Sequence, residues 1–176
     1  MIERLLQWIY ALLPMSTPKY KSHTESSLGD VGIVVNKDLF VQACLHFLKL
    51  PYKWGGDDTI KGFDCSGLVQ ELLAMIGLDP AGDQTAQALY DHFKDKSNEG
   101  RRGVGTLVFF GKSISRITHI GLMLDEHTMI EAGGGGSKTT SLEAAAQANA
   151  YVRLRPFNRR SDLVAVLNPK GLPWAS

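Results

Sequence analysis

The stretch 51–77 constrains this chain more than any other, because it places a cysteine in the first turn of an amphipathic helix. Apolar residues recur over 68–76 with the spacing of one helical face, and Gly77 is suited to end the helix. Asp64 comes directly before Cys65 and is a favoured N-cap residue. The sequence therefore predicts that the Cys65 thiol lies at a helix N-terminus.

A thiol at this position is suited to act as a nucleophile. The unpaired backbone amides of a first helical turn favour a negative charge such as a thiolate. Gly62, Ser66 and Gly67 are small, and we interpret them as leaving the thiol with little cover. The alternative is a buried structural cysteine, which is our interpretation of Cys44 because it lies on the apolar face of another predicted helix.

Two motifs carry a resemblance to a known family. Tyr-Lys-Trp-Gly-Gly at 52–56 and Phe-Asp-Cys-Ser-Gly-Leu-Val at 63–69 resemble the signature of the NlpC family of cell-wall cysteine peptidases. Downstream, 107–110 and 118–124 resemble the strand before the catalytic base and the strand that carries it. The resemblance implies an α+β, papain-like (NlpC-type) single domain, in which the helix that bears the nucleophile packs on an antiparallel sheet.

The resemblance also implies that His119 is the catalytic base. Alternating residues over 119–124, a turn centred on Asp125 and a return strand over 128–132 predict a hairpin. In that hairpin His119 would face Glu131 directly, within the ~5 Å of a cross-strand pair. The family more often has His, Asn or Gln at the third position. Glu131 is therefore either a variant residue that orients His119, or the third role lies elsewhere.

Substrate-binding residues follow from the same resemblance. Tyr52 is similar in position to a family tyrosine beside the nucleophile, and a half-buried aromatic without that role is equally compatible with the sequence. Asp64 and Ser66 match family positions that meet a substrate amine. Backbone amides at the start of the Cys65 helix would bind the oxyanion.

The domain organisation follows from changes in composition. We predict an N-terminal amphipathic helix and linker at 1–36, an NlpC-type peptidase domain at 37–170 and a tail at 171–176. The apolar face within residues 1–15 would dock on the domain or on a partner. The segment is shorter than the about 20 apolar residues of a membrane span and has no convincing signal-peptide pattern, although an uncleaved anchor remains an alternative.

Composition excludes several function classes. The formal net charge of the 176 residues is +1, which gives no argument for nucleic acid binding. We interpret the local basic strip of Arg153, Arg155, Arg159 and Arg160 as solvated surface. Two cysteines cannot form a disulfide scaffold. The sequence has no CxxC pair, no HExxH motif and no calcium-loop motif, so no metal or cofactor is predicted.

Further elements are predicted from local patterns. Asn36 and Ser141 are expected to cap helices, and Pro51 to end the first of these. The remaining predictions are strands at 32–35, 106–110, 151–157 and 163–167, and a helix that ends near 93.

The function expected from the sequence is a thiol hydrolase. It would cleave an amide bond near the D-glutamyl-diamino acid position of peptidoglycan stem peptides, with Cys65, His119 and Glu131 as its catalytic residues. The pattern is closest to phage-encoded members of the family, so the enzyme would act at the cell wall, in the periplasm, outside the cell or on a virion. A phage tail or another delivery protein would bind the N-terminal helix. A cysteine acyltransferase or deamidase with a non-wall substrate, and an inactive structural protein of a phage particle, are the alternatives.

Overall fold

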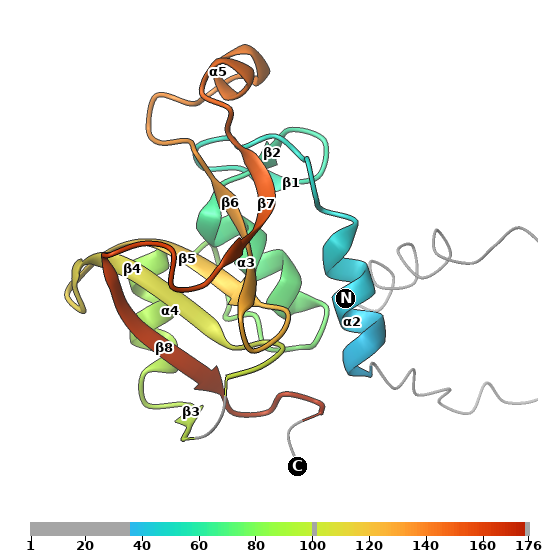
Figure 1. Ribbon diagram of the computed structural model, residues 1–176, viewed down its shortest axis with the longest axis vertical. Coiled ribbons are helices and arrows are strands. Elements are labelled where there is room, and N and C mark those ends of the chain that lie inside the picture. The colour runs from blue at the N-terminus through green and yellow to red at the C-terminus, as the bar shows by residue number, and fades with distance from the viewer. Residues whose placement is uncertain (1–35, 100–101, 175–176) are drawn as a thin grey trace, which may run out of the picture. The chain divides into compact units, whose positions relative to one another are not determined.

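The computed structural model describes residues 36–99 and 102–174 of the chain (Figure 1). The amphipathic helix predicted within 1–15 and the strand predicted at 32–35 lie outside these residues. The described elements are α2 (Lys37–Leu45), β1 (Asp57–Asp58), β2 (Gly62–Phe63), α3 (Cys65–Ala74), α4 (Ala86–Phe93), β3 (Ser97–Asn98), β4 (Leu107–Ser113), β5 (Arg116–Met123), β6 (Thr128–Gly133), α5 (Leu142–Gln147), β7 (Tyr151–Pro156) and β8 (Leu163–Pro169).

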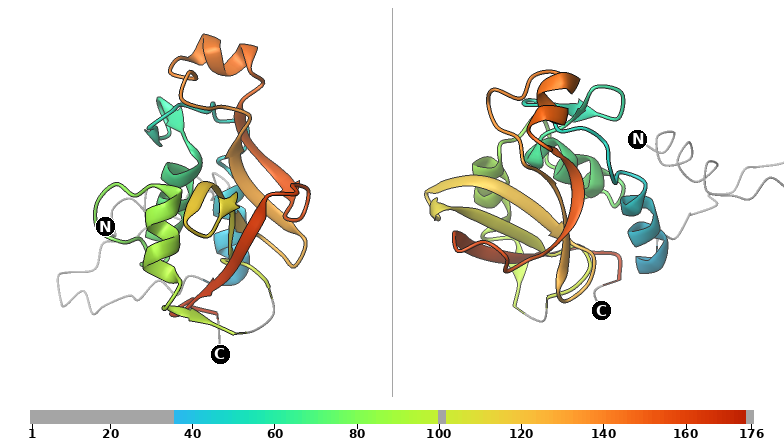
Figure 2. Two further views of the ribbon diagram at one scale, coloured as in Figure 1. Left: turned by 90° about the vertical axis from the view of Figure 1, so that its left-hand side faces the viewer. Right: turned by 45° about the horizontal axis from the view of Figure 1, so that its top comes forward.

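Six of the strands form one antiparallel sheet with the order β3-β8-β4-β5-β6-β7. Strands β1 and β2 form a separate two-stranded sheet next to the start of α3. Helix α3 packs against β5 and β6, and α4 packs against β5. The side view in Figure 2 shows α3 and α4 on one side and the long strands on the other. The predicted α+β arrangement, with the Cys65 helix on an antiparallel sheet, is confirmed.

Side-chain caps start four of the helices. Asn36, Asp64, Thr85 and Ser141 each accept hydrogen bonds from backbone amides of the helix that they precede. Such caps satisfy amides that have no partner within the helix and typically contribute about 1 kcal/mol each. The helix starts predicted after Asn36, Asp64 and Ser141 are confirmed.

The core lies between α3 and the central strands. Leu68, Leu72 and Leu73 of α3 are fully buried, as are Leu107 and Phe109 of β4. Burying a side chain of this size stabilises the fold by roughly 1.5–3 kcal/mol.

A second cluster consists of Val108, Phe110, Met123 and Met129, and Phe157, Leu163 and Val166 pack against it. His119 lies on the same face of β5 as Met123, because side chains two residues apart along a strand share a face. The Phe110 and His119 rings are 5.6 Å apart between centroids. The sheet therefore presents His119 beside an apolar cluster.

The C-terminal residues 171–174, which are predicted to form a tail, pack against the domain near α2. Leu172 is buried, and the Trp174 ring lies 5.0 Å from that of Phe40 between centroids. Within the described residues, no helix combines the length and apolar character that a membrane crossing requires.

Candidate active site

The start of α3 has the geometry that the sequence predicts. One oxygen of Asp64, Oδ1, accepts hydrogen bonds from the amides of Ser66 and Gly67 and from the Ser66 hydroxyl, each at 2.9 Å. Cys65 itself is 9% exposed. Our interpretation that Gly62, Ser66 and Gly67 leave the thiol uncovered was wrong, because Cys65 itself is buried.

Close packing explains the small residue at position 67. A Cβ atom on Gly67 would lie 2.2 Å from the carbonyl oxygen of Gly56, well inside van der Waals contact. The Asp64 amide donates to the same carbonyl at 2.9 Å, and the Gly55 amide donates to Asp64 Oδ2 at 3.0 Å. The two sequence motifs therefore form one structural unit, and this unit fixes the position of Cys65.

The same contacts reduce the number of backbone amides that are free to bind an oxyanion. The amides of Ser66 and Gly67 already donate to Asp64, so they are not available to a substrate oxygen. Among residues 36–99 and 102–174, none accepts a hydrogen bond from the Cys65 amide. Of the amides expected to bind the oxyanion, the N–H of Cys65 is therefore the one left to do so.

His119 joins the helix start to the sheet. Its Nε2 atom lies 2.7 Å from Glu131 Oε2, and its ring is also hydrogen-bonded to the Cys65 side chain. Because Nε2 faces Glu131, Nδ1 is the ring nitrogen left to meet the thiol. Burial by itself would lower the pKa of His119, but the hydrogen bonds to Cys65 and Glu131 outweigh it and raise the pKa from 6.5 to about 9. The imidazolium is therefore the favoured form at neutral pH.

Glu131 is 1% exposed and remains an ionised carboxylate. Burial opposes the charged form, but the hydrogen bond from His119 and the positive charges of His119, Arg159 and Arg160 hold the pKa of Glu131 below its usual range. A carboxylate at this position can orient the ring of His119 and stabilise its protonated state.

The predicted register of the hairpin was wrong, although the contact between His119 and Glu131 that it predicted is present. Strand β5 pairs Leu122 with Ile130 and Met123 with Met129. Continued by one residue, this register places Gly121 opposite Glu131. His119 is two residues further along the same face and reaches Glu131 along a diagonal, which long side chains can do.

Tyr52 lies near Cys65 and is 4% exposed. Burial raises the pKa of its hydroxyl, and the nearby Cys65 and Asp64 side chains raise it further. Its ring packs on the glycine-rich run after β6: a Cβ atom on Gly135 would lie 2.1 Å from Tyr52 Cδ1. The position next to Cys65 agrees with the expected one, and the substrate-binding role stays a prediction.

Asp64 and Ser66 also stay predicted substrate-binding residues. Ser66 is 8% exposed, and its hydroxyl donates to Asp64 Oδ1. Asp64 is half-buried, and its Oδ2 accepts one hydrogen bond among the described residues, from the Gly55 amide. Oδ2 is therefore the oxygen of this pair with capacity for a further donor.

Two arginines near the site were missed by the sequence analysis, which assigned them to solvated surface. Arg159 Nη2 lies 3.5 Å from Glu131 Oε1. Arg160 donates to Asp162 with Nε at 2.8 Å and lies over the ring of Phe110, 5.0 Å from its centroid. No local pattern marks these residues, because each contact depends on how the segment before β8 folds back.

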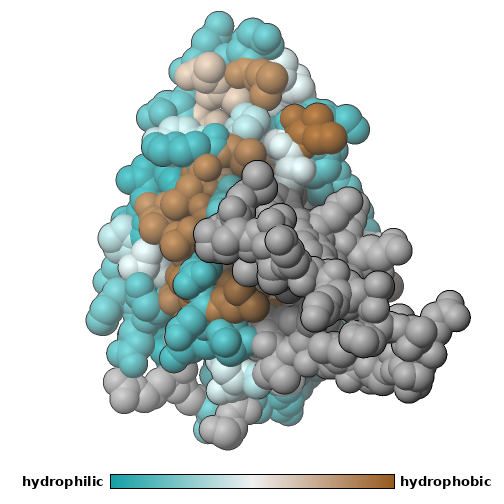
Figure 3. All heavy atoms as spheres, turned by 90° about the vertical axis from the view of Figure 1, so that its right-hand side faces the viewer, coloured by the Kyte–Doolittle hydropathy of each residue, from teal (hydrophilic) through white to brown (hydrophobic). Residues whose placement is uncertain are grey.

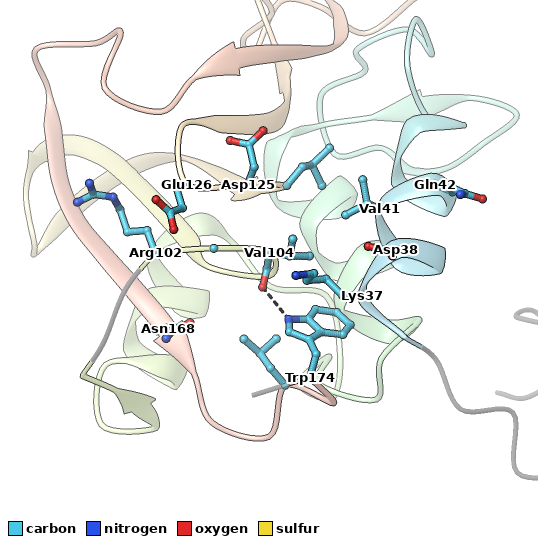
Figure 4. Close-up of a pocket in the computed structure, with 13 residues that line it drawn as sticks. Lys37, Asp38, Val41, Gln42, Arg102, Val104, Asp125, Glu126, Asn168 and Trp174 are labelled. Carbon is cyan, nitrogen blue, oxygen red and sulfur yellow. Dashed lines mark hydrogen bonds between the residues drawn. The ribbon is translucent and has the colours of Figure 1, made fainter. Parts of the chain in front are cut away.

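A surface cavity of about 760 Å³ lies away from these residues, next to α2 (Figure 4). Its lining includes Lys37, Arg102, Asp125 and Trp174, and it includes none of the predicted site residues. The Trp174 indole N–H donates to the Val104 carbonyl at 3.0 Å. Within residues 36–99 and 102–174, no group of three or more His, Cys, Asp or Glu side chains is placed to hold a metal ion.

Large exposed apolar side chains come from separate elements. On the face drawn in Figure 3, polar residues interrupt the apolar surface. The exposed large apolar residues of the described chain are Leu45, Trp54, Ile60, Ile114, Leu142 and Leu154.

Two curated proteins with similar sequences are named as endopeptidases. The chain is 36% identical over 96 residues to the bifunctional muramidase/DL-endopeptidase CwlT of Bacillus subtilis. The aligned region covers 53% of this chain and 28% of CwlT. It is 31% identical over 107 residues to the probable peptidoglycan endopeptidase LytE of the same organism, and this aligned region covers 61% of this chain and 30% of LytE. The chain thus spans less than a third of the length of either relative. Neither is a phage protein, so they give no support to the predicted phage association.

Solved structures show the same fold at low sequence identity. An NlpC/P60 family protein from Bacillus cereus has a TM-score of 0.54 and 19% identity, covering 80% of this chain and 41% of that protein. RipD of Mycobacterium tuberculosis, a non-catalytic NlpC/p60 domain protein adapted to peptidoglycan binding, has the same TM-score and identity. The match covers 76% of this chain and 96% of the RipD chain. The predicted papain-like fold is confirmed. Residues 49–156, more than half of the chain, match the sequence profile of the NlpC/P60 family, and the chain therefore belongs to that family.

Proposed function

We propose that this protein is a thiol hydrolase that cleaves an amide bond in peptidoglycan stem peptides at the cell wall. Cys65 is the nucleophile, His119 the general acid and base, and Glu131 the residue that orients His119. The observation that carries this proposal is the 2.7 Å contact between two buried residues, His119 and Glu131. The ring of His119 also contacts the thiol of Cys65, which lies at the start of α3. Family membership and the two cell-wall relatives support it.

The first half of the reaction follows from these contacts. The Cys65 thiolate attacks the carbonyl carbon, and the oxyanion that forms accepts a hydrogen bond from the Cys65 amide. The C–N bond then breaks as the imidazolium of His119 gives its proton to the leaving amine. The products of this step are a free amine, a thioester on Cys65 and a neutral His119.

The second half releases the acyl group. Neutral His119 takes a proton from water, and the hydroxide attacks the thioester carbonyl. Collapse of the intermediate breaks the C–S bond, releases a carboxylic acid and restores the thiolate beside the imidazolium. Throughout, Glu131 keeps Nε2 of His119 occupied, so that Nδ1 stays directed at the reacting atoms.

The finer specificity belongs to the same proposal. We place the scissile bond near D-glutamate and the diamino acid, with Tyr52, Asp64 and Ser66 at the substrate amine. CwlT is named as a DL-endopeptidase, which supports this choice of bond. Binding of a delivery protein or phage tail through the segment 1–36 stays a prediction.

The test is digestion of purified sacculi by the wild type, Cys65→Ala and Cys44→Ala. Cys44 is a matched control, because it is fully buried in α2 and burial raises the pKa of its thiol. We expect Cys65→Ala to abolish release of soluble products and Cys44→Ala to retain activity within about threefold at matched folded fraction.

Mass spectrometry of the products separates the alternatives. Hydrolysis gives a new carboxylate and a new amine, acyl transfer gives a new amide or ester, and deamidation releases ammonia. If the wild type leaves sacculi and soluble muropeptides unchanged while its thiol reacts rapidly with iodoacetamide at pH 6, the peptidoglycan substrate is wrong. If the thiol also reacts no faster than free cysteine, the protein is not a thiol enzyme.

A further inference from the structure

The carboxylate of Glu131 has two different partners, one on each oxygen. Oε2 faces His119 at 2.7 Å, and Oε1 faces Arg159 Nη2 at 3.5 Å. Glu131 is 1% exposed, whereas 36% of the Arg159 side chain is accessible to solvent. A buried carboxylate is strongly destabilised unless a cation or hydrogen-bond donors compensate its charge.

The charge on His119 cannot supply that compensation throughout a reaction cycle. When the ring protonates the leaving amine it becomes neutral, and the charge of Glu131 then has to be balanced by another group. An arginine keeps its positive charge at every pH at which proteins are folded. Arg159 is therefore suited to balance Glu131 in both protonation states of His119.

The segment that carries Arg159 is held in place at several points. The Arg159 amide donates to the Pro156 carbonyl at 3.2 Å. Three residues later, the Asp162 carbonyl accepts a hydrogen bond from the Gly111 amide of β4 at 2.9 Å. The Asp162 side chain pairs with Arg160. The loop between β7 and β8 is thus tied to the strand next to β5.

Other charged groups near Glu131 have their own partners. Arg160 is paired with Asp162, and its guanidinium lies over the ring of Phe110. Arg153 is opposite Glu131 in the β6–β7 register, but its guanidinium bonds the Gly133 carbonyl at 3.2 Å and lies over the Tyr151 ring. Among the arginines of the described residues, Arg159 is the one whose guanidinium forms an ion pair with the carboxylate of Glu131.

We propose that Arg159 is a positioning residue, whose guanidinium keeps Glu131 an ionised carboxylate directed at His119 throughout the catalytic cycle. The inference rests on the proposed function for the roles of Cys65, His119 and Glu131. It adds a residue that touches neither the substrate nor the reacting atoms and acts through Glu131.

Replacing Arg159 with a neutral residue should change the pH dependence of kcat/KM. The titratable groups that respond are Glu131 and His119, and Arg160 and Asp162 form the nearest charged pair. Loss of a positive charge raises the pKa values of the acids around it, so both limbs of the kcat/KM profile should move to higher pH. Because Arg159 is partly exposed, we expect a shift of about half a pH unit. A purely structural defect would lower the rate at all pH values without moving the limbs.

The experiment compares Arg159→Met and Arg159→Gln with Arg159→Lys and with Arg116→Met. Arg116 is an exposed residue of β5, so its substitution makes the same change in net charge away from Glu131. We expect both neutral variants at 159 to shift the limbs and to lose about fivefold in kcat/KM at pH 6, while Arg159→Lys largely restores the profile and Arg116→Met matches the wild type.

A second readout needs no substrate. The rate at which iodoacetamide alkylates Cys65, measured against pH in the Cys44→Ala background, should differ from the wild-type rate in both neutral variants and match it in Arg116→Met. If wild-type protein cleaves no stem peptide, the proposed function fails, and alkylation still tests the role of Arg159. Profiles of folded Arg159→Met and Arg159→Gln that coincide with the wild type within about 0.2 pH units, or an equal shift in Arg116→Met, would overturn the inference.

Discussion

At the scale of single residues, the chemistry of the site depends on how a buried carboxylate is balanced. Glu131 hydrogen-bonds His119 directly, and both residues are nearly inaccessible to solvent. A carboxylate in this setting can do two things for His119: it can orient the ring, and its charge can favour the imidazolium. Substitutions that remove these two effects separately can distinguish them.

Glu131→Gln should keep the ring oriented through its amide oxygen and lose the charge, whereas Glu131→Ala loses both. We expect kcat/KM to fall about tenfold for Gln and about a hundredfold for Ala, which corresponds to roughly 1.4 and 2.7 kcal/mol. Because Glu131 raises the pKa of His119, the alkaline limb of the pH profile should move to lower pH in both variants. Wild-type kcat/KM in Glu131→Ala across the whole pH range would show that Glu131 does not orient His119.

Gly135 and Gly136 offer a matched pair for testing the placement of Tyr52. A Cβ atom at 135 would lie 2.1 Å from Tyr52 Cδ1, whereas one at 136 would meet nothing within 4 Å. Gly135→Ala should displace the Tyr52 ring, destabilise the protein by about 1–3 kcal/mol and lower kcat/KM about tenfold. Gly136→Ala should be close to the wild type in urea unfolding and in kinetics. Equal behaviour of the two variants would contradict the packing of Tyr52 on Gly135.

At the scale of elements, α3 is positioned by its contact with the turn that precedes β1. Asp64 caps the helix with one oxygen and holds Gly55 with the other. Gly67 lets the first helical turn approach the Gly56 carbonyl. The helix start can therefore not move without moving the turn, and this coupling sets where Cys65 lies relative to β5.

Gly67→Ala tests this coupling, because two effects of opposite sign compete. Alanine raises intrinsic helix propensity by about 1 kcal/mol, but its Cβ would clash with backbone at 2.2 Å, and such overpacking typically costs about 1–3 kcal/mol. We expect the clash to dominate, so that the free energy of unfolding falls and Cys65 alkylation slows. Gly103→Ala, whose Cβ would meet nothing within 4 Å, is the control. A more stable Gly67→Ala protein with unchanged thiol reactivity would show that the helix start tolerates the extra atom.

At the scale of the whole molecule, the site should make stability depend on pH. The pKa of His119 is raised from 6.5 to about 9 in the folded protein, so the folded state binds a proton that the unfolded chain releases earlier. The contribution of this bound proton to the free energy of unfolding is fully present below about pH 6.5 and is lost as the pH rises through about 9. The net effect is a folded state that is less stable in mildly alkaline solution.

Urea unfolding at pH 6.5, 7.5 and 9.5 measures this effect. We expect the free energy of unfolding of the wild type to fall by about 1–3 kcal/mol over this range. Cys65→Ala removes one of the two groups that raise the pKa of His119, so its decline should be smaller and should end at a lower pH. A wild-type stability that is constant between pH 6.5 and 9.5 would mean that His119 is not held as a cation.

Local features of this protein were predictable from the sequence. The Cys65 helix, its Asp64 cap and the hairpin that carries His119 each depend on residues within a few positions of one another. Periodicity, capping residues and turn residues act over that range, so the sequence by itself determined these elements. The motifs around Cys65 also determined the family and, with it, the fold.

The contacts between distant segments were decided only by the tertiary structure. A shift in hairpin register turned a directly opposed pair into a diagonal contact between His119 and Glu131. Arg159 reaches Glu131 from 28 residues further along the chain, and Gly135 meets the ring of Tyr52 from an even more distant segment. Such contacts depend on how strands and loops pack after they form. No local pattern encodes that packing, because it minimises buried charge and void volume over the whole core.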